Sequence, residues 1–163
     1  RPACGAHMGT TITQATEADI PDLVEIWKDY MDYHRDIDSF YTVEERGPAS
    51  FGAYLAELMG QENVLIVKAE NGDECAGFAI AKIESRPPVY EEKMFGHITD
   101  MAVRPTHRRH GAGERMLERL FDWFRQRNIS RVQLNVVPDN SVGFSFWRKM
   151  GFETFLLAMY KEI

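Results

Sequence analysis

The stretch Val103-Arg-Pro-Thr-His-Arg108-Arg109-His110-Gly111-Ala112-Gly113 carries the most information in this chain of 163 residues. It joins a strand-like run to a strongly amphipathic helical pattern. Two glycines at a strand-to-helix turn leave backbone N–H groups clear of side chains, and the positive end of the helix dipole attracts anions there. Basic residues come directly before the glycines. The stretch therefore predicts a binding site for a phosphorylated ligand.

The length suits one domain with a substantial core. We expect residues 9–163 to form that domain and residues 1–8 to be a vector-derived remnant or disordered. No apolar run approaches the roughly 18 residues of a membrane span, and the N-terminal residues show no secretory pattern. Outside residues 1–8 only Cys75 supplies a thiol, which excludes an internal disulfide framework and fits a reducing cytoplasm.

The net charge of −6 conceals an asymmetry along the chain. Residues 17–45 contain ten acidic residues against two basic ones (net −8), whereas residues 104–127 contain seven arginines against three acids (net +4). The basic segment suits an anionic ligand; the acidic one either attracts a cation or is a solvated helix face. Nucleic-acid binding is disfavoured, because the whole chain is acidic and no aromatic residues interleave with the arginines. A metal site is disfavoured because the histidines lack ligand-like spacing.

Hydrophobic periodicity predicts one strand, two helices, three strands, a helix, a strand, a helix and a closing strand or strand pair. A capping-box pattern at Thr16–Asp19 begins the first helix, Asn71-Gly72 indicates a hairpin, and Gly96 marks a bulge. A strand–helix–strand crossover is normally parallel, so the sheet is mixed and the fold class is α/β (α+β). The expected strands lie near residues 11–15, 63–70, 75–85, 93–103, 131–137 and 152–161, and the helices near 20–33, 49–59, 112–127 and 141–150.

A second motif lies downstream, where Asn140 precedes a helix that ends Phe146-Trp147-Arg-Lys-Met-Gly151-Phe152. Together with Arg108-Arg-His-Gly111-Ala-Gly113, it makes the chain resemble the GNAT superfamily of N-acetyltransferases over residues 10–163. The resemblance implies a mixed, mostly antiparallel central sheet of about six to seven strands flanked by about four helices. It also implies a V-shaped splay between the fourth and fifth strands, and acetyl-CoA as the acetyl donor.

In that family, acetyl-CoA would place its pyrophosphate on the turn amides and run its pantetheine arm through the splay. Backbone groups of Met101 and Val103 would bond the pantetheine like an added strand, and one N–H would face the thioester carbonyl. A tight turn with close helix packing is the alternative for the glycines, and a helix N-cap is the alternative for Asn140. The cofactor-binding residues implied are Met101, Ala102, Val103, Arg108, Arg109, His110, Gly111, Ala112, Gly113, Glu114, Asn140 and Phe146.

An amine with a pKa of about 10 must lose a proton before it can attack a thioester. His97 and Asp100 are the candidate catalytic residues, because some family members carry acids at these strand positions. Imidazole titrates near neutrality, and Asp100 would orient the amine if it does not deprotonate it. The two lie three positions apart in the sequence, so a regular strand would place them on opposite faces unless a bulge intervenes. Each could equally be an ordinary strand residue.

Trp147 departs from the family pattern. Many members place a tyrosine there to protonate the departing thiolate, and an indole N–H has no useful acidity. We expect an active enzyme in which water or another hydroxyl serves instead, with Tyr160 as a candidate substitute.

The wall of the acceptor pocket is expected within residues 30–41. Tyr33, His34, Asp36, Asp38 and Phe40 mix carboxylates with rings, which suits a cationic amine, although each could instead cover the core. The expected function is acetyl transfer to the primary amine of a cationic small molecule, such as a diamine, amino acid or aminoglycoside, in a ternary complex. A protein N-acetyltransferase and a non-catalytic acyl-CoA-binding domain are the alternatives, and a homodimer is left open.

Overall fold

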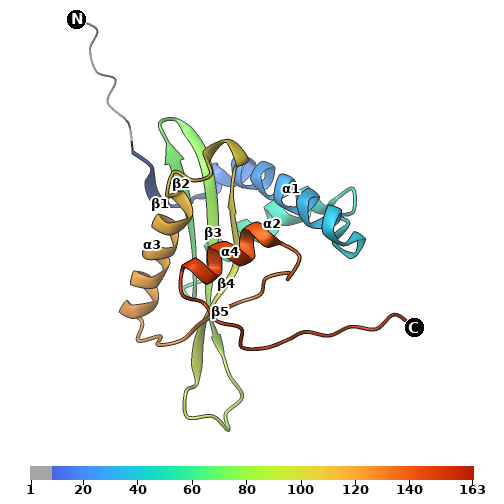
Figure 1. Cartoon of the computed structure of the whole chain (residues 1–163). Helices are drawn as coiled ribbons and strands as arrows, with labels where there is room; N and C mark the ends of the chain where they lie inside the picture. Colours follow the sequence, from blue (N-terminus) through green and yellow to red (C-terminus); the bar gives the residue numbers. More distant parts are fainter. Residues whose placement is uncertain (1–8) are drawn as a thin grey trace, which may run out of the picture.

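A computed structural model describes residues 9–163, and the expectation for residues 1–8 lies outside that range. One mixed sheet, in the order β1-β2-β3-β4-β5, forms the centre of the molecule (Figure 1). Neighbouring strands are antiparallel except β4 and β5, which are parallel. The elements are β1 Thr11–Gln14, η1 Glu17–Asp19, α1 Ile20–Ile37, η2 Ser39–Tyr41, α2 Gly47–Met59, β2 Val64–Asn71, β3 Glu74–Ser85, β4 Met94–Val103, η3 Pro105–His107, α3 Ala112–Gln126, β5 Val132–Leu134 and α4 Ser141–Lys149.

The sheet separates two apolar cores. One face packs against α1 and α2, around Leu23 and Phe78. The other face packs against α3, whose apolar residues Met116, Leu120 and Phe124 recur at helical spacing and are fully buried. The predicted fold class is confirmed, with five strands in place of the expected six to seven.

The first helical segment begins at the capping box that the sequence predicted. The Thr16 backbone N–H donates to the Asp19 carboxylate at 2.8 Å, which confirms the capping box, although it begins the short turn η1 directly before α1. The helix α1 then continues to Ile37, four residues past the predicted end at Tyr33. Within the described chain, no helix combines the length and the apolar character needed to cross a membrane.

The strand β4 contains one extra residue relative to β3. Ile98 pairs with Ala81 and Asp100 pairs with the next β3 residue, Ile80, so Thr99 has no partner in the register. This is a β-bulge, which shifts the alternation of side chains by one residue.

The bulge places His97 and Asp100 on the same face of the sheet. Their β3 partners are two residues apart, and paired residues in antiparallel strands share a face. That face packs against α1 and α2. The expected bulge at Gly96 is wrong: this glycine keeps its register, and an added Cβ there would lie 2.6 Å from the Phe124 ring.

The strands β4 and β5 pair over only three residues, near the beginning of β4. Residues 96–98 pair with Val132–Leu134, whereas β4 stays paired with β3 as far as Val103. Past Ile98 the edge of β4 that faces β5 is therefore open, which confirms the predicted splay. The strand β5 itself is shorter than the predicted 131–137.

The expected closing strand at residues 152–161 is wrong. Residues 153–163, called the C-terminal arm below, form no helix or strand and extend away from the body (Figure 1). A strand needs a neighbouring edge to bond its N–H and C=O groups. The backbone of the arm makes no hydrogen bond to the rest of residues 9–163.

Candidate active site

The turn between β4 and α3 presents a row of backbone N–H groups. Six consecutive amides, those of residues 109–114, donate to no acceptor among the residues that the structure describes. Arg109 (φ 65°) and Gly111 (φ 79°) both adopt the left-handed conformation, and Gly111 caps α3. A Cβ added to Gly111 would meet nothing within 4 Å. Free amides at a helix N-terminus, in open space, form a concavity for an anion.

The two glycines of the motif have different roles. A Cβ on Gly113 would lie 3.2 Å from ring carbons of Phe146, so this glycine allows α4 to approach the first turn of α3. Close helix packing therefore accounts for Gly113. It does not account for Gly111, whose surroundings are open and whose backbone conformation disfavours other residues.

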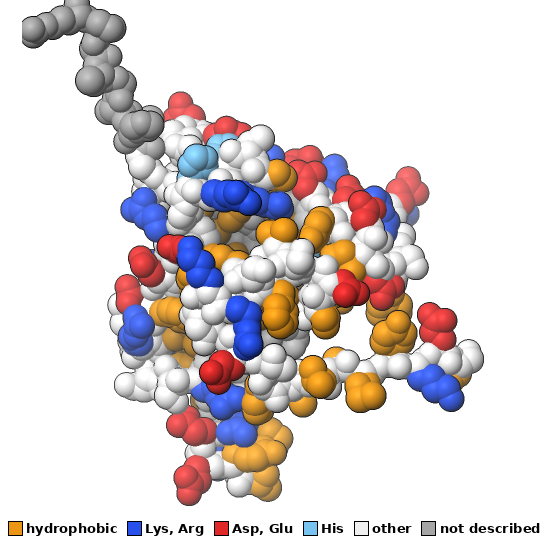
Figure 2. All heavy atoms as spheres, viewed as in Figure 1, with side chains coloured by type: hydrophobic (Ala, Val, Ile, Leu, Met, Phe, Trp, Pro, Cys, Tyr) orange, Lys and Arg blue, Asp and Glu red, His pale blue; other side chains and the backbone are white. Residues whose placement is uncertain are grey.

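The distribution of charged side chains also favours an anion at this turn. Lys and Arg side chains gather where β4 passes into α3, and acidic side chains cover the region of α1 and α2 (Figure 2). Arg108, Arg109 and His110 are exposed on the turn. Arg104, in contrast, is bound inward, because its Nε donates to the Cys75 carbonyl at 2.9 Å. The turn is thus the positive end of an otherwise acidic molecule.

The open edge of β4 presents the backbone of Met101 and Val103. The Arg104 N–H donates to the Ala76 carbonyl on β3 at 2.8 Å, and backbone direction alternates along a strand. Ala102 therefore also bonds towards β3, and the residues on either side of it turn their N–H and C=O groups to the splay. Ala102 lines the same cleft, and its methyl group is buried in the core under α1.

One side chain already contacts this edge. Arg108 Nε donates to the Val103 carbonyl at 3.3 Å, across the mouth of the splay. The guanidinium is exposed, so it is free to exchange this contact for one with an anion.

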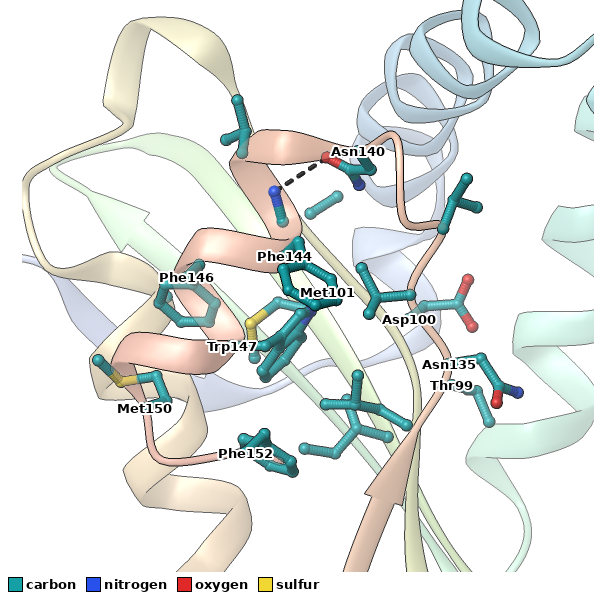
Figure 3. Close-up of a pocket in the computed structure, with 18 of the residues that line it drawn as sticks. Thr99, Asp100, Met101, Asn135, Asn140, Phe144, Phe146, Trp147, Met150 and Phe152 are labelled. Atoms are coloured by element: carbon teal, nitrogen blue, oxygen red, sulfur yellow. Dashed lines mark hydrogen bonds between the residues drawn. The ribbon is translucent and has the colours of Figure 1, made fainter. Parts of the chain in front are cut away.

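A cleft of about 2650 Å³ connects the amide turn, the splay and the inner side of α1. Figure 3 shows its two sides: apolar side chains of α4 on one, and Asp100, Thr99 and Asn135 on the other. The apolar side consists of Met101, Phe144, Phe146, Trp147, Met150 and Phe152.

Asp100 supplies a half-buried carboxyl group to this cleft. Burial raises its pKa above the ordinary value of 3.8, while the positive charges of Lys82 and His97 act in the opposite direction. Burial, together with the negative charge of Asp100, also raises the pKa of Tyr30 to about 12. The cleft therefore contains a carboxyl group of increased basicity near a phenol that stays protonated at neutral pH.

His97 does not line the cleft, although it shares a face with Asp100. Its Nδ1 lies 3.0 Å from the Glu84 carboxylate, further down the sheet. Of the two candidate catalytic residues, the structure brings only Asp100 to the open part of the splay.

On the acceptor side, Tyr33, His34 and Phe40 line the cleft. Asp36 does not; it faces solvent and pairs with Arg35 at 3.2 Å. Tyr30, Asp38 and Tyr41, which lie within the expected wall of residues 30–41, also line the cleft. Sequence reasoning missed Asp29, which lies just before that range and reaches the same cleft.

His34 and Asn140 connect α1 to α4 at one end of the cleft. Asn140 Oδ1 accepts from the Gly143 N–H at 2.9 Å, which confirms the helix N-cap alternative (Figure 3). His34 Nδ1 lies 2.8 Å from the Tyr30 carbonyl, so Nδ1 carries the proton and Nε2 accepts. The Asn140 amide nitrogen faces this Nε2 at 3.5 Å. Both polar ends of Asn140 thus have protein partners.

Trp147 is part of an aromatic cluster on the apolar side of the cleft. Its ring lies edge-on to Phe146 at 4.9 Å and to Phe152 at 5.3 Å between centroids. Tyr160, the expected substitute for the missing general acid, is on the C-terminal arm and is largely exposed.

Comparison with known proteins agrees with this geometry. The model of the acetyltransferase (GNAT) family matches residues 20–152. A tetramutant of the BH1408 protein from Bacillus halodurans has a similar fold (TM-score 0.83, 16% identity, 94% of this chain and 99% of that chain). So do a predicted acetyltransferase with acetyl-CoA from Clostridium acetobutylicum (0.76, 24%, 94% and 96%) and an aminoglycoside antibiotic 6′-N-acetyltransferase from Acinetobacter haemolyticus (0.73, 19%, 94% and 99%). These likenesses show the fold, and the family match spans most of the sequence. The chain belongs to the GNAT family of acetyltransferases.

Proposed function

We propose that the protein transfers an acetyl group from acetyl-CoA to the primary amine of a cationic small molecule, by direct attack in a ternary complex. One observation carries this proposal. A row of six amides, which have no acceptor within residues 9–163, leads along an open strand edge to a half-buried carboxyl group.

The residues of the turn and the splay fit acetyl-CoA. The amides of residues 109–114 suit its pyrophosphate, and the exposed arginines add charge. The backbone of Met101 and Val103 suits the pantetheine amides, which would bond as a strand does. When bound, the cofactor supplies an acetyl group already activated as a thioester. The neighbour from Clostridium acetobutylicum was solved with acetyl-CoA, which supports this choice.

The inner side of α1 fits a cationic acceptor. Asp29, Asp38 and Asp100 contribute carboxyl groups to the cleft, and Tyr30, Tyr33, Phe40 and Tyr41 contribute rings. Carboxylates and ring faces both attract ammonium groups. The neighbour from Acinetobacter haemolyticus acts on an aminoglycoside, a polyamine of this kind.

Asp100 is the group that accepts the proton of the incoming ammonium. Its raised pKa brings it closer to that of the amine, which favours transfer. A Met101 or Val103 N–H that faces the splay then stabilises the negative charge that grows on the carbonyl oxygen. His97 favours the ionised form of Asp100 through its charge.

A thiol-release assay with acetyl-CoA tests the proposal over a panel of acceptors. We expect turnover with polyamines, aminoglycosides or lysine-like amino acids, and none with neutral or anionic acceptors. Turnover confined to peptides would identify a protein N-acetyltransferase. Binding of coenzyme A with no thiol release from any amine would identify a non-catalytic acyl-CoA-binding domain.

His97→Gln should move the acid limb of the kcat/KM profile to higher pH. The positive charge of His97 lowers the pKa of Asp100, so its removal allows that pKa to rise further. The measurement is the pH profile of kcat/KM. In the Asp100→Asn background the same substitution should cause no shift, because the limb itself is absent. A shift to lower pH would contradict the assignment.

Trp147→Phe should leave kcat within about threefold of the original, against the roughly 10²–10⁴-fold that a general acid contributes. Phenylalanine keeps most of the packing with Phe146 and Phe152 and removes only the indole N–H. Steady-state kinetics at saturating acceptor would show this. A hundredfold loss of kcat with an unchanged KM would mean that the indole takes part in the chemistry.

A further inference from the structure

The helix α4 has few polar contacts with the body of the domain. None of its residues is buried, and the segment that joins it to β5 forms no helix or strand. Residues 140–152 make two hydrogen bonds to residues 9–134. One is the ion pair of Lys149 with Glu114 on α3, whose side chains are 71% and 44% exposed, and ion pairs of this kind contribute little. The other joins Asn140 to His34 on α1.

The contact between Asn140 and His34 is buried and has a single direction. Asn140 is 8% exposed and His34 is 5% exposed. The Gly143 N–H occupies the amide oxygen of Asn140, so the amide nitrogen is the group that faces His34. The proton on His34 Nδ1 is donated to the Tyr30 carbonyl, so Nε2 accepts from that amide nitrogen, at 3.5 Å. Each partner is thus fixed by a second bond in the orientation that the contact requires.

Three tyrosine rings hold the His34 ring in this orientation. Its centroid lies 4.2 Å from that of Tyr30, 5.7 Å from that of Tyr33 and 5.6 Å from that of Tyr41. These tyrosines line the acceptor side of the cleft, whereas both nitrogens of His34 have protein partners. A direct bond from His34 to an acceptor amine would break one of these contacts. The side chain therefore suits a link between the two sides of the cleft better than a contact with the acceptor.

We propose that His34 is a positioning residue for the cofactor: through Asn140 it holds the beginning of α4 against α1 and so keeps Phe146 and Trp147 over the splay. Both rings extend from α4 on the apolar side of the cleft (Figure 3). Phe146 also packs on Gly113 of the amide turn. A displacement of α4 would therefore change the surface that faces the ligand. This role of His34 rests on the proposed function where it names acetyl-CoA as that ligand.

Loss of the contact should shift the population of α4 positions. Without it, α4 is held by aromatic packing and by an exposed ion pair, and the helix is displaced in a fraction of the molecules. The apparent dissociation constant of the cofactor is then its intrinsic value divided by the fraction of molecules in which α4 is in place. Saturation with acetyl-CoA restores that position. The expected result is a raised KM for acetyl-CoA with little change in kcat.

Two amide substitutions separate the two nitrogens of His34. Glutamine is long enough to put its amide oxygen near the position of Nε2, so His34→Gln can still accept from Asn140. Asparagine is one methylene shorter and reaches only the position of Nδ1, so His34→Asn loses that contact. The two variants therefore carry the same functional group into the same site and differ in the bond to Asn140.

Amide hydrogen exchange, followed by mass spectrometry on the free protein, tests the position of α4 without any ligand. In His34→Asn the amides of residues 144–149 should exchange at least about tenfold faster than in the original protein, and in His34→Gln at close to the original rate. The amides of β2 and β3 should be unchanged in both variants. Equal α4 exchange in all three proteins, equal acceleration in both variants, or acceleration spread over the sheet would overturn the proposal.

Binding and kinetics test the consequence for the cofactor. Isothermal titration with coenzyme A should give a dissociation constant at least about fivefold higher in His34→Asn, but not in His34→Gln. The kcat at saturating acetyl-CoA and the KM for the acceptor should stay within about twofold of the original values. A raised KM for the acceptor alone would refute the proposal, because His34 would then contact the acceptor. If the original protein bound no coenzyme A, the proposed function would fail, whereas the exchange rates would still decide whether His34 holds α4.

Discussion

Asp100→Asn should lower kcat/KM for acetyl transfer by roughly 10²–10⁴-fold, the range for loss of a general base. The variant keeps the shape and hydrogen-bonding capacity of the side chain and loses only the ability to accept a proton. Steady-state kinetics with the best acceptor from the thiol-release screen would measure the effect. In the original protein the rate should rise with pH through the raised pKa of Asp100, and the variant should lack that limb.

The same substitution should not destabilise the protein. Because the pKa of Asp100 is raised in the folded state, its ionised form opposes folding. That cost is absent below the ordinary pKa of 3.8 and grows as the pH rises through the folded value. The variant cannot ionise, so its melting temperature at neutral pH should equal or exceed that of the original, and the difference should vanish in acid.

Asp36→Asn is the matched control for both measurements. Asp36 undergoes the same chemical change, but it faces solvent outside the cleft. We expect its kinetics to be unchanged within about twofold, because exposed ion pairs of this kind contribute little. If the two variants behaved alike, Asp100 would not be the proton acceptor.

Gly111→Val should raise the dissociation constant for coenzyme A at least about tenfold. A β-branched residue is strongly disfavoured at a φ of 79°, and the left-handed conformation costs roughly 1–2 kcal/mol for ordinary residues. The turn would relieve this strain by rotating its peptides, and the amides of residues 109–114 would lose their common direction. A change of 1.4 kcal/mol corresponds to about tenfold in affinity. Isothermal titration with coenzyme A is the direct measurement.

Gly111→Asn distinguishes backbone strain from steric obstruction. Asparagine tolerates the left-handed conformation better than other residues with a side chain, and the Cβ position is open. Its affinity should therefore lie much nearer to that of the original protein. Equal and unchanged affinities for both variants would show that the turn does not hold the nucleotide.

Helices, strands and turns could be predicted from the sequence where neighbouring residues determine them. The capping box, the helix α3 and the hairpin between β2 and β3 depend on side-chain periodicity and turn residues. The position of the bulge did not follow, because glycine at residue 96 serves the packing of Phe124, and nothing local singles out Thr99 as the unpaired residue. The prediction of a closing strand was wrong for a different reason. The composition of residues 152–161 favours a strand, but a strand forms only where its backbone pairs with the edge of another strand, and the local sequence does not determine that pairing.

The candidate site divides in the same way. The glycine turn could be located from its own residues, because a motif at a strand-to-helix junction fixes backbone direction. The acceptor wall could be placed within residues 30–41, but which of its side chains line the cleft could not, since that depends on which face of α1 meets the sheet. The four-residue extension of that helix turned Asp36 outward, while Asp38, just beyond its end, lines the cleft.

The unpaired Thr99 reverses the alternation of side chains and backbone groups in the rest of its strand. Upstream of it, Gly96 directs its N–H to β5; downstream, the odd-numbered residues do so, and the chemistry of the cleft follows from that change of parity. Deletion of Thr99 would move every later side chain of β4 to the opposite face of the sheet. It would also turn the N–H groups of Met101 and Val103 towards β3, away from the splay. The presence of one extra residue in β4, more than the identity of that residue, keeps the Asp100 carboxyl group and the free backbone groups of β4 directed into the same cleft.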